Sequence, residues 1–355
     1  MRLLPFIGAT LAACTELDIL AGQHVVYSYP GATVPSSLVT LTKQGLVGGV
    51  ILFGENVNAN TTRDMTTLKN AYAASPAPAL LKKLTGKDAK FFISTDQEGG
   101  QVRRIKNAEP KLSAKQMGAA ADPAKAGSDG GSGAAAALKS YGLNANLAPV
   151  LDVFRQAGDF EDYYQRSFGN TSQQVVAAAV PFIKAQQAGS VAATAKHFPG
   201  LGAASHDANT DAQPVTLDQS LDEIRNIDEA PYVDAIKAGL ELVMASWAVY
   251  PALDARPAGL SNKWMKDELR GRLGFTGVTI TDAMEAGALK GISDDERAIQ
   301  ATSAGMDILL ASGRNATQGD VLRKAIIKGI NNGRINRQQF DDATVRIASM
   351  RSRLA

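Results

Sequence analysis

Ionisable side chains follow several apolar segments of this 355-residue sequence. Asp96 follows the apolar run KFFIST, Lys196 and His197 follow VAATA, and Asp282 follows GVTIT. Burial of an unpaired charge costs several kcal/mol, so each of these groups must be paired or must face a cavity. Two carboxylates with cationic neighbours fit glycoside hydrolysis better than phosphoryl transfer.

Further polar residues occupy similar positions along the chain. Glu98, Asp152 and Glu285 also lie at or just beyond the ends of apolar runs, and Arg104 follows a Gly-Gly pair that lets the backbone turn sharply. Arg166 lies in a polar loop that also holds two tyrosines. These residues are candidates for contacts with a polar substrate.

Purely structural interpretations exist for the same residues. Asp96 fits the N-cap of a helix, Arg166 fits a solvated or ion-paired surface group, and Asp282 fits a structural ion pair. The individual motifs therefore leave both interpretations open.

The positions of these residues depend on the strands that precede them. Eight apolar segments, bounded by Gly, Pro or polar residues, have the form expected of parallel strands buried on both faces. They alternate with helical patterns, which predicts a single-domain (β/α)8 TIM barrel over residues 15–355, with a doubly wound α/β sheet as the alternative. The active site of such a barrel lies at the carboxyl ends of the strands, where the ionisable residues fall. The eight segments span 24–31, 48–54, 90–98, 143–152, 191–200, 240–250, 277–285 and 306–312.

Local signals mark some of the intervening helices. Ser293 with Glu296 predicts a capping box at the start of the helix before the eighth strand. Phe340, Ala343, Ile347 and Met350 predict an apolar stripe on the last helix. The patch AGSDGGSGAAAA, at 126–137, predicts a loop that runs into a helix.

Composition limits the kind of partner. The 37 Lys and Arg residues nearly balance the 35 Asp and Glu residues, and no basic run of five or more residues occurs, so we expect no nucleic-acid partner. The single cysteine, Cys14, excludes an internal disulfide. Without a His/Cys cluster of zinc spacing or a Gly-rich phosphate loop, we expect neither a metal nor a cofactor, and we expect a monomer.

The first 14 residues, MRLLPFIGATLAAC, resemble a targeting segment. One Arg precedes about a dozen apolar or small residues, too few to span a bilayer but typical of a signal peptide. LAAC also resembles the cleavage site of bacterial lipoproteins, whose cysteine becomes lipidated. The segment predicts secretion or a lipid anchor at Cys14; a cytoplasmic protein with an ordinary N-terminal segment is the alternative.

Four motifs taken together point to a known family. DQEGGQVRR (96–104), RSFGN (166–170), KHFPGLG (196–202) and ITDAMEAGAL (280–289) occur in this order at predicted strand ends. Their order and spacing resemble family 3 glycoside hydrolases of the single-domain β-N-acetylhexosaminidase type, over residues 20–350.

The resemblance implies a retaining β-N-acetylglucosaminidase on a TIM barrel that works through a covalent glycosyl-enzyme. Asp282 matches the family's nucleophile, and nearby Lys and Arg residues are expected to lower its pKa. The residues that match the family's contacts with the sugar in the terminal subsite are Asp96, Arg104, Arg166, Lys196 and His197, with Asp152 at a neighbouring strand end.

The sequence departs from the family in the loop after KHFPG. The family carries a His in this loop as general acid and base, oriented by an Asp two residues earlier. Here Asp207 falls where that Asp is expected, but Asn209 falls where the His is expected, and Leu201 replaces another loop His. The pair His206 and Asp207 offers the same two groups in reversed order.

Three interpretations of this loop stay open. His206 could enter the site with Asp207 or Asp211 as its partner, because the loop has small residues that let it move. Asp207 or Asp211 could itself be the acid. Alternatively, the residue is absent and the enzyme is slow or inactive.

The leading hypothesis is an exo-β-N-acetylglucosaminidase that acts on cell-wall fragments or chitooligosaccharides. The alternatives are a β-glycosidase of the same family that prefers another sugar, such as a β-glucoside, and a sugar-binding protein that has lost turnover. Asn209 is the feature that favours the last alternative.

Overall fold

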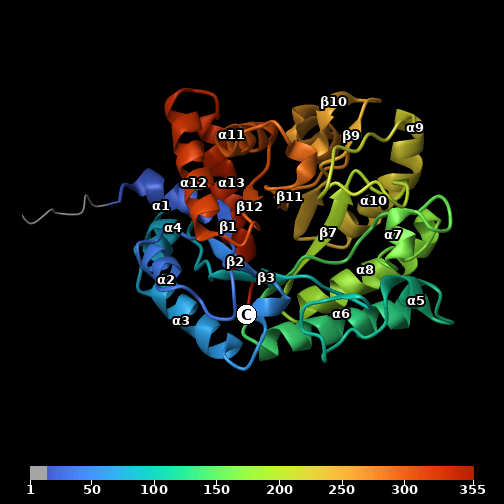
Figure 1. Cartoon of the computed structure of the whole chain (residues 1–355), viewed down its shortest axis with the longest axis horizontal. Coiled ribbons are helices and arrows are strands. Elements are labelled where there is room, and N and C mark those ends of the chain that lie inside the picture. The colour runs from blue at the N-terminus through green and yellow to red at the C-terminus, as the bar shows by residue number, and fades with distance from the viewer. Residues whose placement is uncertain (1–13) are drawn as a thin grey trace, which may run out of the picture.

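Eight parallel strands form a closed barrel in the computed structural model, which describes residues 14–355 (Figure 1). The strand pairs β1–β2 and β1–β12 close the cylinder, with Val25 opposite Leu309. The predicted barrel is confirmed, and the doubly wound sheet was wrong. Each strand falls within one of the eight predicted segments: β1 (Val25–Tyr27), β2 (Gly49–Leu52), β3 (Phe92–Thr95), β6 (Ala145–Asn146), β7 (Ala192–Phe198), β8 (Leu242–Ala245), β11 (Val278–Ala283) and β12 (Ile308–Leu310).

Helices surround the barrel (Figure 1). They are α1 (Glu16–Gln23), α2 (Ser36–Lys43), α3 (Thr61–Ala73), α4 (Ala77–Thr85), α5 (Ala114–Gly118), α6 (Pro123–Ser140), α7 (Phe160–Tyr163), α8 (Ser172–Ala188), α9 (Leu221–Glu223), α10 (Ala230–Lys237), α11 (Asp294–Ala304), α12 (Ala316–Asn331) and α13 (Arg337–Arg351), with π-helical segments at Ile224–Asp228 and Lys263–Arg272 and 3-10 turns at Gly54–Asn56, Ala258–Leu260 and Gly287–Leu289.

Alternation along the strands produces two apolar layers. Val26 and Ile51 belong to one cluster of buried side chains, whereas their neighbours Val25 and Val50 belong to another, as expected when successive strand residues point to opposite faces. The first cluster fills the barrel and includes Ile347 and two further apolar residues near the C-terminus. The second packs the strands against the surrounding helices.

The last helix follows its predicted stripe. Phe340, Ala343, Ile347 and Met350 are all buried on α13. At α11, Ser293 accepts a hydrogen bond from the backbone N–H of Glu296 at 3.4 Å, as predicted. The Glu296 carboxylate does not complete the capping box, because it pairs with Arg334 instead, so that half of the prediction was wrong.

The Gly-rich patch at 126–137 is helical throughout, within α6, so the predicted loop was wrong. A Cβ on Gly127 would lie 2.0 Å from the carbonyl oxygen of Ala178, and one on Gly131 would lie 2.1 Å from that of Phe182. Both partners belong to α8. The glycines therefore let two helices approach closely, and this packing outweighs their low helix propensity.

Short elements beyond the strand ends carry polar residues toward the mouth of the barrel. β4 (Gln97–Gly99) and β5 (Val102–Arg103) form one antiparallel hairpin, and β9 (Val249–Tyr250) and β10 (Asp254–Pro257) form another. The chain after β6 continues alongside β7, where Val150 bridges to Lys196.

The predicted leader at 1–14 lies outside the described residues except for Cys14, which is half-buried, has a free thiol and packs against the core. Within residues 14–355, we find no helix whose length and apolarity would let it cross a membrane.

Candidate active site

A cavity of about 550 Å³ opens at the carboxyl ends of the barrel strands. The ionisable residues predicted to gather at this rim do so, with Asp152 just beneath the cavity wall. Those that line the cavity are Asp96, Glu98, Arg104, Arg166, Lys196, His197, Asp282 and Glu285.

Lys196 is buried and paired with two carboxylates. Its Nζ lies 3.0 Å from Asp96 Oδ1 and 2.7 Å from Glu98 Oε1. Arg104 approaches Asp96 from the other side, Nη2 to Oδ2 3.5 Å. Burial alone would raise the pKa of Asp96, but the charges of Lys196 and Arg104 lower it, so this carboxylate stays ionised and can accept hydrogen bonds from hydroxyl groups.

Arg166 forms a fork with Glu98. Its Nε and Nη2 each lie 2.9 Å from an oxygen of Glu98, and its Nη1 lies 3.0 Å from Glu161 Oε1. Burial would raise the pKa of Glu98, but Arg166 and Lys196 hold it well below its usual range. Burial raises the pKa of Glu161 despite the charge of Arg166, and the Oε2 atom of Glu161 is buried with no hydrogen-bond partner among residues 14–355.

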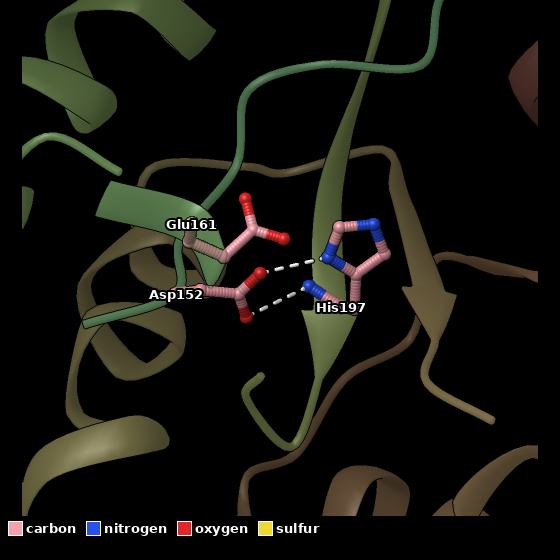
Figure 2. A group of neighbouring side chains, drawn as sticks. All are labelled: Asp152, Glu161 and His197. Carbon is pink, nitrogen blue, oxygen red and sulfur yellow. Dashed lines mark hydrogen bonds and ion pairs between the residues drawn. The ribbon is translucent and has the colours of Figure 1, made fainter. Parts of the chain in front are cut away.

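His197 is held by Asp152. As Figure 2 shows, Asp152 reaches the ring and the backbone of His197: Nδ1 lies 2.7 Å from Oδ2, and the backbone N–H donates to Oδ1 at 3.1 Å. Leu201 N–H donates to the same Oδ1 at 2.8 Å. Burial raises the pKa of Asp152 to about 7, and burial lowers the pKa of His197. The ring is therefore neutral near pH 7, and the hydrogen bond between Nδ1 and Asp152 leaves Nε2 turned away from Asp152.

Asp152, Glu161 and His197 have ligand atoms within 4.8 Å of one another, a spacing compatible with a metal ion (Figure 2). Their atoms are largely engaged already, since Asp152 accepts from the ring and two backbone N–H groups, and Arg166 holds Glu161. This donor set fits a hydrogen-bonded cluster that fixes the His197 ring better than it fits a metal cage.

Lys196 and His197 are consecutive residues of β7, yet both line the cavity. The peptide bond between them is cis, as is the next one but one, between Phe198 and Pro199.

Asp282 is the next-to-last residue of β11 and lines the cavity, and it forms no direct ion pair with any residue of 14–355. Its Oδ1 accepts from the backbone N–H of Ala283 at 2.7 Å. The expectation that Lys and Arg lower its pKa was wrong: burial raises the pKa, the charge of Asp211 raises it further, and His197 and Lys196 oppose this only in part. Lys196 and Arg166 instead form ion pairs with other carboxylates, those of Asp96 and Glu98.

Of the predicted acid/base candidates in the loop after β7, Asp211 lines the cavity, whereas His206 and Asp207 do not. His206 Nδ1 lies 2.8 Å from Asp207 Oδ1, but the side chains are 47% and 94% exposed and neither lines the cavity. Asn209, Thr210 and Asp211 do line it.

The Asp211 end of this loop is docked onto the turn that follows Asp282. Gly287 N–H donates to Asp211 O at 2.8 Å, and Ala288 N–H donates to Thr210 O at 2.9 Å. The Asn209 side chain accepts from the Asp211 backbone N–H at 2.9 Å. These contacts hold Asp211 at the edge of the cavity that contains Asp282.

Sequence reasoning assigned no specific role to Glu98 or Glu161, and it assigned Asp211 a role only as one of several acid/base candidates; the structure brings all three into the site. Glu98 was placed at a strand end. It lies two residues after Asp96, and residues two apart in an extended chain point to the same side, so this spacing could have marked Glu98 as a second partner for Lys196. Glu161 gave no signal, because FEDYY resembles an exposed helical turn. Asp211 was only one of several loop candidates.

A (β/α)8 barrel with ionised carboxylates and cations around a cavity at the strand ends has the features of a glycoside hydrolase. The family described as Glycosyl hydrolase family 3 N terminal domain matches residues 25–350. The chain belongs to this family and is a glycosidase.

Comparison with individual proteins supports the assignment. An uncharacterized secreted glycosyl hydrolase of Arthroderma benhamiae is 49% identical over 349 residues, which cover 98% of this chain and 96% of that protein. A beta-hexosaminidase of Tolumonas auensis is 34% identical over 295 residues, 81% of this chain and 80% of the relative. The structure of a glycoside hydrolase family 3 beta-N-acetylglucosaminidase from Paenibacillus sp. is similar, with a TM-score of 0.86 and 28% identity. The match covers 95% of this chain but only 62% of the Paenibacillus chain.

Proposed function

We propose that this glycosidase removes terminal β-linked N-acetylglucosamine with retention of anomeric configuration, through a covalent bond to Asp282. The observation that carries the proposal is the position of Asp282, a carboxylate near the end of β11 that lines the cavity and has no ion-pair partner in the part of the chain that the structure describes. The names of the Tolumonas and Paenibacillus relatives support the choice of sugar.

In the first step, a carboxylate oxygen of Asp282 bonds to the anomeric carbon as the bond from that carbon to the leaving oxygen breaks. Asp211 donates a proton to the leaving oxygen. In the second step, Asp211 accepts a proton from water, whose oxygen bonds to the anomeric carbon and releases Asp282. Asp211 suits this role because it lines the same cavity and influences the charge of Asp282.

The remaining site residues bind the sugar. Asp96 accepts hydrogen bonds from hydroxyl groups, while Lys196, Arg104 and Arg166 donate them, and His197 presents Nε2. Asp152 acts through His197 by fixing its ring. Bonds to hydroxyl groups that shorten as positive charge develops on the ring stabilise the transition state.

His206 with Asp207 is the second candidate for the acid/base. The 2.8 Å contact already pairs His206 with a carboxylate on the same loop, but the loop must move to bring the exposed His206 ring into the cavity. Asp211 requires no such movement.

We further propose that residues 15–355 form one catalytic domain and that the protein is secreted, as the name of the Arthroderma relative indicates for that protein. The predicted substrates are chitooligosaccharides or cell-wall fragments. A lipid anchor at Cys14 and a monomeric state remain predictions.

Hydrolysis of aryl glycosides tests this function. The wild type should cleave 4-nitrophenyl β-N-acetylglucosaminide and should strongly prefer it to the β-glucoside. Asp282→Ala should abolish cleavage of both this substrate and the 2,4-dinitrophenyl glycoside, whose leaving group needs no proton. Asp211→Asn should reduce cleavage of the 4-nitrophenyl substrate by about 10²-fold or more while largely sparing the 2,4-dinitrophenyl one.

Two outcomes would overturn parts of the proposal. If the wild type cleaves neither substrate, the protein is a sugar-binding homologue, as Asn209 would suggest. If His206→Ala, rather than Asp211→Asn, shows the selective loss, the acid/base is the His206 and Asp207 pair.

A further inference from the structure

An aromatic cluster adjoins the cavity beside the loop that carries Asp211. The rings of Phe160 and Tyr164 lie 5.0 Å apart, and those of Tyr163 and Tyr164 also lie 5.0 Å apart. The ring of His206 packs edge-on to Tyr163 at 4.3 Å. Helix α7 and the loop after β7 thus build one continuous aromatic surface.

This surface is open to solvent. Tyr163 is 56% exposed and Tyr164 is 38% exposed, and among the Phe, Tyr and Trp side chains of residues 14–355 they are the two that are exposed. Phe160 and Tyr164 also line the cavity. Grouped, exposed aromatic side chains at the mouth of a polar cavity indicate a ligand that has both an apolar face and polar edges.

The position of the surface relates it to the leaving group. The loop is attached to α7 by a hydrogen bond from Phe160 N–H to Ala204 O at 3.0 Å. Either acid/base candidate, Asp211 or His206, belongs to this loop. Tyr164 lines the same cavity as Asp211 and Asp282, so a group attached to the leaving oxygen can reach this aromatic surface from the cavity.

We propose that Tyr163 and Tyr164 bind the sugar unit on the reducing side of the cleaved bond. This inference rests on the proposed function. The C–H face of a pyranose ring packs on an aromatic face, and each tyrosine hydroxyl can bond to a neighbouring hydroxyl or amide. His206, held by Asp207, then serves as a positioning residue that supports the Tyr163 ring.

The test compares a substrate that fills this position with one that does not. N,N′-diacetylchitobiose has a sugar as its leaving group, and this sugar fills the proposed position. N-acetyl-β-glucosaminyl fluoride has only a fluoride as its leaving group, so no sugar fills the position. The ratio of kcat/KM for the two substrates is measured for the wild type, Tyr163→Ala, Tyr164→Ala, Tyr164→Phe and Leu84→Ala. Leu84 is 50% exposed on α4 and does not line the cavity, so it is a matched control.

We expect the ratio to fall about ten-fold in either alanine variant, a loss of about 1.4 kcal/mol of transition-state stabilisation. The ratio should fall less in Tyr164→Phe than in Tyr164→Ala, because the phenylalanine keeps the aromatic face and loses only the hydroxyl, and it should stay within about two-fold of wild type in Leu84→Ala. An unchanged ratio in both tyrosine-to-alanine variants overturns the inference, as does an equal fall in Leu84→Ala.

Titration calorimetry separates this inference from the proposed function. If the wild type hydrolyses neither substrate, the proposed function fails, and the subsite is judged by binding alone. The wild type should then bind chitobiose more tightly than N-acetylglucosamine, and both alanine variants should lose that difference. Equal affinities for the two sugars in the wild type would overturn the subsite independently of catalysis.

Discussion

Lys196 and Glu98 form a buried ion pair across the mouth of the barrel, with Nζ 2.7 Å from Oε1 and side chains only 3% and 4% exposed. Glu98 is also the partner of the Arg166 fork, so one carboxylate compensates two buried cations. Glu98 therefore keeps ionised Lys196 and Arg166 in place at the wall of the cavity.

Glu98→Gln should destabilise the fold strongly. The amide keeps the shape of the side chain but removes the negative charge, which leaves two buried cations incompletely compensated. We expect the free energy of unfolding to fall by about 3–5 kcal/mol near pH 7, measured by urea denaturation.

Glu109→Gln is the control, because Glu109 is 54% exposed and lies 3.8 Å from an exposed lysine. That change should stay within about 0.5 kcal/mol of wild type. The pKa of Glu98 is lowered by folding, so its contribution is present above the unfolded-state pKa and is lost as pH falls toward the folded-state value. Equal stabilities of the two variants near pH 7 would contradict the role given to Glu98.

Asp211→Asn should shift the pH dependence of the first chemical step. Asp282 must be ionised to attack, and its pKa is raised by burial and by the charge of Asp211. In the pH range in which Asp211 is ionised, removing its charge lowers the pKa of Asp282, so the acid limb of kcat/KM for this variant should move to lower pH. The 2,4-dinitrophenyl substrate is used, because its cleavage needs no proton donor.

Asp207→Asn provides the matched comparison on the same loop. Asp207 is 94% exposed and does not line the cavity, so its profile should coincide with that of the wild type. A shift of the Asp211→Asn limb to higher pH, or equal shifts in both variants, would show that Asp211 does not act on Asp282 as described.

Gly287→Ala should displace the loop that carries Asp211. A Cβ at this position would lie 2.2 Å from the carbonyl oxygen of Ala212, so the contact between the loop and the turn after β11 must open. A misplaced catalytic group can cost about 10²-fold, and we expect a loss of this order in kcat/KM for the 4-nitrophenyl substrate. The loss for the 2,4-dinitrophenyl substrate should be much smaller.

The comparison for this change is Gly54→Ala, where a Cβ would meet no atom within 4 Å. That variant should retain wild-type activity on both substrates. If Gly287→Ala slows both substrates equally, the loop contact matters for something other than placing the proton donor.

Much of the fold could be predicted because a parallel barrel leaves a repetitive pattern. Each of its strands lies in a short apolar run, and polar residues at the ends of several runs mark the carboxyl ends of those strands. The first half of α6 was not predicted as helix, because its glycines are explained by close contacts with α8, such as that of Gly127 with Ala178. Such contacts join residues that are far apart in the sequence, so the local pattern does not reveal them.

Only the site residues that lie at the ends of strands could be predicted from the sequence. Asp96 follows β3, while Lys196, His197 and Asp282 lie in the last residues of β7 and β11, and all four line the cavity. The pairing of charges was not predictable, since Lys196 and Arg166 had several possible partners and the structure gives them Glu98 rather than Asp282. Glu161 lies far from the strands in sequence, so only the folded chain brings it to Arg166.

The most direct test of the central claim is to trap the covalent intermediate. A 5-fluoro-N-acetyl-β-glucosaminyl fluoride destabilises the transition states of both steps through its ring fluorine, while fluoride leaves readily, so the glycosyl-enzyme should accumulate. We predict that peptide mass mapping of the wild type locates one added sugar on Asp282, and that Asp282→Asn remains unlabelled. An adduct on a different residue, or turnover of this reagent with no adduct, would contradict the account.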